Sequence, residues 1–247
     1  MGRKVLVLAT AVVAMMVLSG CGATQTTVSP HLPKDIATLF YPVIRDADRA
    51  GISVLLPTRL PDLPSAGWTW SLDDYKLNTR GYAFSLVATP RALPPSANED
   101  WMPGAGSPLV MATVSGPPAP YPIVSQMLAQ PTGTVQIAPG IEADSYNHGM
   151  MVRWTKSGWT YTAIGWWPGT GIGIAKQIVA ALGSSPQPVP GSRGQLTASQ
   201  TGNPMYTDVY WTYGRRWFAM TGKAGPSERV SELRSLVRVS PSSNQNW

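Results

Sequence analysis

The first strong hydrophobic feature of the chain lies at its N-terminus. Arg3 and Lys4 precede an uncharged stretch of fourteen residues, Val5 to Leu18. A helix that spans a bilayer needs about 20 apolar residues, whereas the hydrophobic region of a secretory signal peptide has about 7–15. The pattern therefore predicts an export signal over residues 1–20.

Beyond residue 33 the apolar positions first follow helical spacing. Between Asp35 and Arg49 they recur every three or four residues, and Pro42 lies inside this pattern. Because proline disrupts a helix interior, we expect a kink or two short helices here. Strand patterns follow, separated by turn residues such as those at 78–81, and residues 90–108 carry five prolines that predict a long loop. The expected strands cover 52–56, 68–72, 82–89 and 109–114.

The C-terminal half contains a faint internal repeat, residues 141–183 and 195–238. In each copy a strand leads through a turn to V-x-W-T, then to an aromatic strand and an amphipathic helix, so that Trp154 corresponds to Trp211. The helices are expected over residues 173–182 and 226–237. Repeated hairpin-helix units favour an α+β fold, a curved antiparallel sheet with two or three helices on one face.

We expect residues 34–247 to form one domain. Whether residues 34–135 add a third, degenerate copy to the same sheet or form a separate lobe is left open by the pattern. With one cysteine in 247 residues, the domain has no disulfide, so its stability must come from a hydrophobic core.

That cysteine, Cys21, directly follows Leu18-Ser19-Gly20. This segment resembles the lipobox of bacterial lipoproteins. The resemblance implies cleavage between Gly20 and Cys21, acylation of the Cys21 thiol, and anchoring to the lipid bilayer on the extracytoplasmic face of the cell membrane. Residues 21–33 are then the lipidated cysteine and a flexible tether. A secreted protein without lipid and an uncleaved signal anchor are the alternatives.

The charge is mild and scattered. The formal net charge is +6 and only 13% of residues are charged. No cluster of Lys and Arg is interleaved with aromatic residues, so nucleic acid is not an expected partner.

The repeat also carries a family resemblance. The proline-rich stretch LLPTRLPDLP and the W-x-x-x-G hairpin from Trp154 to Tyr161 resemble a group of poorly characterised secreted proteins and lipoproteins of Gram-positive bacteria. More remotely, the architecture is similar to half-barrel lipoprotein carriers and sigma-factor regulators. The resemblance implies no catalytic residues, and a likeness of fold does not determine function.

Catalytic motifs are scarce. His31 and His148 have no second ligand at metal-binding spacing, so no metal and no cofactor is expected. Glu142 and Asp144 alternate on one strand and suit either a glycosidase pair or a solvated strand face. The glycine-rich run from Gly169 suits either a phosphate loop or a strand-to-helix turn, and we favour the turn because the preceding strand is expected to belong to a hairpin.

Aromatic residues are the remaining signal, with ten Trp and nine Tyr against three Phe. Trp166 and Trp167 are adjacent, and neighbours on a strand point to opposite faces, so one indole must avoid the core. These two are the candidate binding residues. We expect a non-enzymatic module that binds or senses a cell-envelope glycan, lipid, peptide or protein, with a wall hydrolase as the rival. Alternatively, the aromatics pair inside the sheet: Trp154, Trp159, Tyr161, Trp211, Tyr213 and Trp217.

Overall fold

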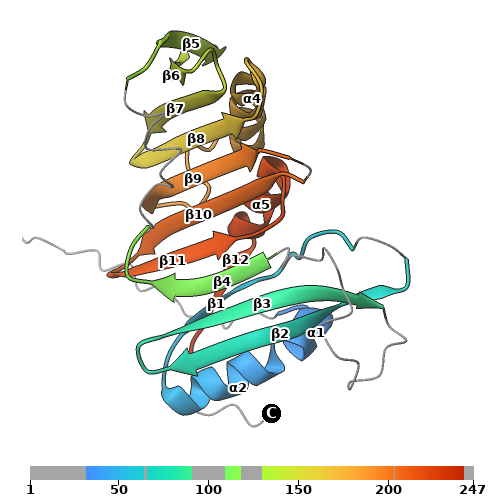
Figure 1. Cartoon of the computed structure of the whole chain (residues 1–247). Helices are drawn as coiled ribbons and strands as arrows, with labels where there is room; N and C mark the ends of the chain where they lie inside the picture. The colour runs from blue at the N-terminus through green and yellow to red at the C-terminus, as the bar shows by residue number, and fades with distance from the viewer. Residues whose placement is uncertain (1–31, 64–65, 91–108, 118–129, 203, 242–247) are drawn as a thin grey trace, which may run out of the picture.

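The computed structural model describes residues 32–63, 66–90, 109–117, 130–202 and 204–241. Within these residues ten strands form one open sheet, in the order β2-β3-β4-β11-β10-β9-β8-β7-β6-β5, and β1 pairs with β12 in a separate ribbon. Figure 1 shows the strands of the large sheet stacked one above another, with α4 and α5 together behind it. The predicted α+β class, an antiparallel-rich sheet with helices on one face, is confirmed. The predicted signal and Cys21 lie outside the described residues.

The N-terminal helical pattern forms two short helices, as expected. α1 (Lys34–Leu39) ends at Phe40, and α2 (Tyr41–Ala50) begins with Pro42 in its first turn, where the missing N–H of proline has no helical partner to lose. Gly51 then ends α2 in the left-handed conformation at φ 65°. The next segment enters the fully buried strand β1 (Val54–Pro57).

The first hairpin joins the same sheet as the C-terminal repeat. β2 (Trp68–Asn78) and β3 (Gly81–Pro90) pair across the predicted turn, where the Asn78 side chain accepts hydrogen bonds from the backbone N–H groups of Arg80 and Gly81. β4 (Leu109–Val114) pairs with β3 on one side and with β11 on the other. The N-terminal strands therefore extend one continuous sheet.

The two copies of the repeat contain the same succession of three strands and a helix. In each, the last two strands form a hairpin that carries the aromatic residues, and the helix returns across the sheet. The first copy follows the edge strand β5 (Gly133–Ala138) and contains β6 (Ile141–Tyr146), β7 (Met151–Lys156), β8 (Trp159–Gly165) and α4 (Thr170–Leu182). The second contains β9 (Arg193–Gln200), β10 (Tyr206–Tyr213), β11 (Arg216–Thr221) and α5 (Pro226–Arg234).

Two sequence-based expectations were wrong. β8 and β9 pair in parallel, with α4 as the crossover, so the strand that precedes the glycine-rich run belongs to a β-α-β unit as well as to a hairpin. The second helix ends at Arg234 rather than at residue 237, because Leu236 and Val237 lie in β12 (Leu236–Val239) and pair with β1. Both errors concern pairings between segments that are distant in sequence.

One row of side chains shows how the core is built. Seven residues, each paired to the next across neighbouring strands, are all buried on the face that the helices cover. They belong to a single apolar cluster that also includes residues of α1, α2, α4 and α5. The row runs Phe84, Met111, Met220, Val209, Leu196, Tyr161, Trp154.

Candidate functional site

The two candidate binding residues lie on the surface. Trp166 is 55% exposed and Trp167 is 67% exposed, in the turn between β8 and α4. Since an indole that faces water forgoes the stabilisation of burial, two adjacent exposed indoles are an unusual use of the largest side chain. The turn is therefore the first candidate site.

Hydrogen bonds hold the backbone of this turn in place. The Thr170 hydroxyl donates to the carbonyl oxygen of Trp167 at 2.6 Å, and the Trp167 N–H donates back to Thr170 Oγ1 at 3.2 Å. The neighbouring β6–β7 turn supplies two further acceptors, because Gly165 N–H donates to Met150 O at 2.7 Å and Gly169 N–H donates to His148 O at 3.0 Å. The indoles thus extend from a backbone that is fixed on both sides.

The glycine-rich run is explained by close packing of two turns. A Cβ on Gly171 would contact the carbonyl oxygen of Met150, and a Cβ on Gly149 would lie 2.8 Å from the side chain of Ile172. Only glycine permits so close an approach. Gly169 ends the strand-to-helix turn that we favoured, in the left-handed conformation at φ 79°, and the strand before it is part of a parallel pair. Gly171 and Gly173 already lie in α4, which begins at Thr170 and not at residue 173 as predicted.

The other aromatic residues largely pack inside the sheet. Trp154 stacks on Tyr161 with ring centroids 5.0 Å apart, and Trp211 stacks on Phe218 at 5.7 Å. Trp159 donates its indole N–H to Ser192 O at 2.9 Å. Tyr213 and Trp217 depart from this expectation, since Tyr213 is exposed and Trp217 is half-buried on the opposite face of the sheet.

The acidic strand has the arrangement of a solvated face. Glu142 and Asp144 are both exposed, Glu142 accepts a hydrogen bond from Thr134 at 2.7 Å, and Asp144 lies opposite Arg153. His148 is exposed in the β6–β7 turn. In the part of the chain that the structure describes, no three His, Cys, Asp or Glu side chains gather as metal ligands would.

Two charged residues of α5 are themselves buried, which sequence reasoning did not anticipate. The side chains of Arg229 and Glu232 are 0% and 1% exposed and form an ion pair of 2.6 Å. Burial raises the pKa of Glu232 to about 7, because removing the carboxylate from water outweighs the attraction of Arg229. Burial also raises the pKa of Asp208, whose carboxylate accepts the backbone N–H of Gly222.

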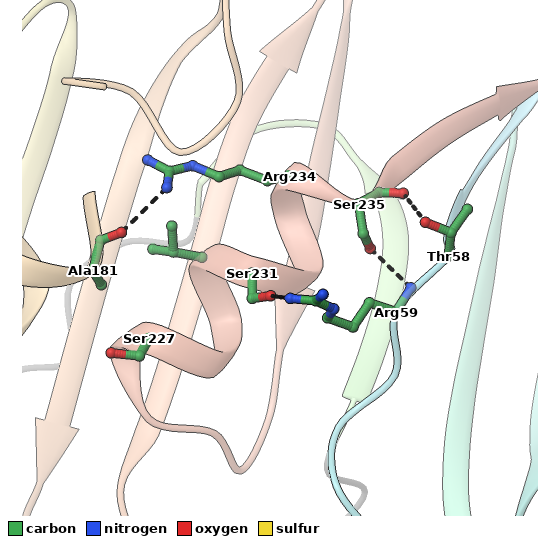
Figure 2. Close-up of a pocket in the computed structure, with 8 residues that line it drawn as sticks. Thr58, Arg59, Ala181, Ser227, Ser231, Arg234 and Ser235 are labelled. Carbon is green, nitrogen blue, oxygen red and sulfur yellow. Dashed lines mark hydrogen bonds between the residues drawn. The ribbon is translucent and has the colours of Figure 1, made fainter. Parts of the chain in front are cut away.

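A second candidate site is a groove of about 530 Å³ beside the outer face of α5. Ser227, Ser231 and Ser235 recur every four residues along that face, and Arg59 reaches it from the segment between β1 and β2. Figure 2 shows Arg59 directed at Ser231, and Arg234 extended towards Ala181 at the end of α4. We refer to this site as the arginine–serine groove; Thr58 and Val230 complete its lining.

Hydrogen bonds order the two arginines of the groove. Arg59 Nη1 donates to Ser231 Oγ at 2.7 Å, and the Arg59 backbone N–H donates to Ser235 Oγ at 3.1 Å. Arg234 donates to the carbonyl oxygens of Ala181 and Leu182, at 3.3 Å and 2.6 Å, and so caps the end of α4. The serine spacing along 226–237 was the sequence signal that could have pointed to this site.

Comparison with known proteins adds no relative. No protein-family model, no curated protein and no solved structure matches the chain significantly. The resemblance to Gram-positive lipoproteins therefore stays a prediction. Among the described helices, none combines the length and the apolar character that crossing a bilayer requires.

Proposed function

We propose that the chain is a non-enzymatic binding module of the cell envelope, tethered through acylated Cys21, and that Trp166 and Trp167 contact its ligand. The observation that carries the proposal is the exposure of two adjacent indoles on a hydrogen-bonded turn. A fixed backbone lowers the conformational entropy that is lost when these side chains bind.

The chemistry of the indoles favours a glycan as the ligand. An indole offers a flat apolar face and one N–H donor, so it can stack on the apolar side of a sugar ring and donate to a hydroxyl. Cell-wall glycan lies within reach of a tethered protein on the outer face of the membrane. The tether, residues 21–33, extends at most about 45 Å, so such a module would work close to the bilayer.

The rival, a wall hydrolase, finds less support in the side chains. Glu232 has the raised pKa that a general acid needs, but its carboxyl group is sealed in the core at 1% exposed. Glu142 and Asp144 stand on an open strand face, where water competes with any substrate. Because the buried Glu232 cannot reach a substrate, and Glu142 and Asp144 are not shielded from water, we favour binding over catalysis.

Sedimentation with insoluble cell-wall glycan tests the proposal. The full chain, purified in mild detergent, should pellet with the glycan, and the variant Trp166→Ala/Trp167→Ala should lose at least tenfold in affinity. Tyr213→Ala is the matched control, since Tyr213 is an exposed aromatic at the end of β10, next to the β10–β11 turn.

Three results would count against the proposal. Equal binding by the double variant and by the Tyr213→Ala control would remove the indoles from the site. A large fall in the melting temperature of the double variant would mean that these indoles support the fold instead. Release of soluble wall fragments during the incubation would favour the hydrolase.

A further inference from the structure

We propose that the arginine–serine groove is a second ligand site, which takes a phosphate ester carried on a polyol or sugar. The proposal rests on the groove alone and holds whether or not Trp166 and Trp167 bind a glycan. Its volume of about 530 Å³ lies in the range of small-molecule sites.

The groove carries positive charge without a matching carboxylate. Arg59 and Arg234 line it, and none of its other lining residues is acidic. Over the described ranges, neither Arg59 nor Arg234 forms an ion pair. Two uncompensated guanidinium groups on one concave surface attract an anion.

Both arginines keep donors available. A guanidinium group has five N–H donors in a planar fork that matches phosphate oxygens. Arg59 uses one of them on Ser231, and Arg234 uses two of its nitrogens on the last carbonyls of α4. These bonds hold each guanidinium in position while its remaining N–H groups can meet a ligand. An anchored arginine loses less side-chain entropy on binding than a free one.

Hydroxyl groups suit the rest of the ligand. Ser231 Oγ accepts from Arg59, which leaves its own O–H to donate to a phosphate oxygen. Ser227 adds a second hydroxyl one helical turn away, and it is exposed. A lining of hydroxyls and guanidinium groups offers little apolar contact, so a hydroxyl-rich ester fits better than a fatty acid or a peptide with large apolar side chains.

The two proposed sites are well separated. Trp167 precedes α4, whereas Ala181 of the groove lies near its end. The thirteen residues of α4 span about 20 Å at 1.5 Å per residue. A ligand the size of a monosaccharide phosphate cannot touch both, so the two sites can be tested independently.

Isothermal titration of the full chain with glycerol 3-phosphate tests the groove, with glycerol as the uncharged probe. We expect binding of glycerol 3-phosphate that weakens as salt is raised from 50 to 300 mM, and no measurable binding of glycerol. Arg59→Gln should weaken the affinity about tenfold, because a charge-assisted hydrogen bond is lost. Arg80→Gln is the matched control, since Arg80 is exposed in the β2–β3 turn, away from the groove.

Arg234 also caps α4, so Arg234→Gln can lower stability as well as affinity. Arg234→Lys keeps the charge but not the planar fork, and it should weaken binding while the melting temperature stays within a few degrees of the parent value. Arg59→Gln, at an exposed position, keeps the test valid if Arg234 variants unfold.

A second arm distinguishes a soluble ester from a lipid headgroup. Vesicles of phosphatidylglycerol and of phosphatidylcholine are compared by flotation, with the Cys21→Ala variant so that acylation does not contribute. Binding of phosphatidylglycerol vesicles that is lost in Arg59→Gln assigns the site to a headgroup, and binding of glycerol 3-phosphate alone assigns it to a soluble ester. Equal affinity for glycerol and glycerol 3-phosphate, or equal effects of Arg59→Gln and Arg80→Gln, would overturn the proposal.

Discussion

Arg229 and Glu232 form a buried ion pair one turn apart on α5, with Arg229 Nη1 2.6 Å from Glu232 Oε2. Arg229 Nε also donates to the carbonyl oxygen of Thr207 at 3.0 Å, which ties the helix to β10. Glu232 Oε1 is buried and finds no partner within the described residues. The pair thus joins the helix to the sheet but leaves one carboxylate oxygen of Glu232 without a hydrogen bond. Removing this carboxylate from water therefore costs more free energy than its contact with Arg229 recovers.

The first prediction concerns removal of one partner. At pH 8, Arg229→Met should lower the free energy of unfolding by about 3–5 kcal/mol, because a buried carboxylate is left without its cation. The double variant Arg229→Met/Glu232→Leu should recover most of that loss, since no buried charge remains. Urea denaturation of the three proteins measures both effects. A double variant that is as unstable as Arg229→Met would show that the hydrogen bond to Thr207, and not the ion pair, is what the helix requires.

The second prediction is a dependence of stability on pH. Burial raises the pKa of Glu232 from 4.5 to about 7, so the folded chain holds a proton that the unfolded chain has released between these values. The resulting stabilisation is present below pH 4.5 and is lost as the pH rises through about 7. We expect the free energy of unfolding to fall by on the order of 2–3 kcal/mol between pH 5 and pH 8.

Glu232→Gln is the control for this titration, because glutamine keeps the shape and cannot ionise. Its stability should vary less with pH than that of the parent chain. Asp208 shifts in the same direction, so Asp208→Asn should flatten the profile further. Parent and Glu232→Gln profiles that run parallel would contradict the raised pKa of Glu232.

Local patterns in the sequence predicted the elements of this fold well. The helix break just before Pro42, the hairpin at Asn78 and the buried aromatic pairs each follow from residues that are close in the chain. What failed depends on distant partners. Leu236 and Val237 suit a helix as well as a strand, and only the edge offered by β1 decides between them. The parallel pairing of β8 with β9 likewise follows from where α4 packs.

The candidate sites show the same division. Because Trp166 and Trp167 are neighbours in the sequence, we expected one of them to lie outside the core, and in the structure both are exposed. The sequence did not predict the groove, because Arg59 lies more than 160 residues before Ser227 and contacts α5 only in the folded chain. Within α5, the charged side chains of Arg229 and Glu232 are buried, whereas the serine-bearing face is the one that borders the groove.

The third prediction contrasts two glycine-to-alanine changes. Gly194 lies between Trp159 and Trp211 in neighbouring strands, and an added Cβ would contact the carbonyl oxygen of Tyr210 and lie 2.9 Å from Trp211 Cα. Because these obstacles are backbone atoms, Gly194→Ala should destabilise the chain by about 1–3 kcal/mol. Gly173, within α4, has open space around it, and Gly173→Ala should stabilise by about 0.5–1 kcal/mol.

Urea denaturation of the parent chain and of the two glycine variants gives both changes in the free energy of unfolding. The slope of the transition is compared as well, because a change in slope would mean that the unfolded state differs. A Gly194→Ala variant as stable as the parent would mean that β9 and β10 separate at little cost. If Gly173→Ala and Gly194→Ala destabilised the chain equally, the close packing around Gly194 would not be the cause.

The last prediction concerns the anchor. If Cys21 is acylated, the processed chain begins at Cys21, and its intact mass exceeds that of the polypeptide by a diacylglyceryl group or more. Two or three acyl chains, at about 0.8 kcal/mol for each buried CH₂, hold a protein in the bilayer far more firmly than one. The parent chain should therefore sediment with membranes and enter the detergent phase on phase separation, whereas Cys21→Ala should do neither.

Ser19→Ala keeps a small residue before the cleavage point and should behave as the parent does. An unmodified thiol at position 21, cleavage at another bond, or continued membrane retention of Cys21→Ala would each contradict the lipid anchor, while leaving the binding experiments on the tryptophan turn and the groove to be judged on their own results.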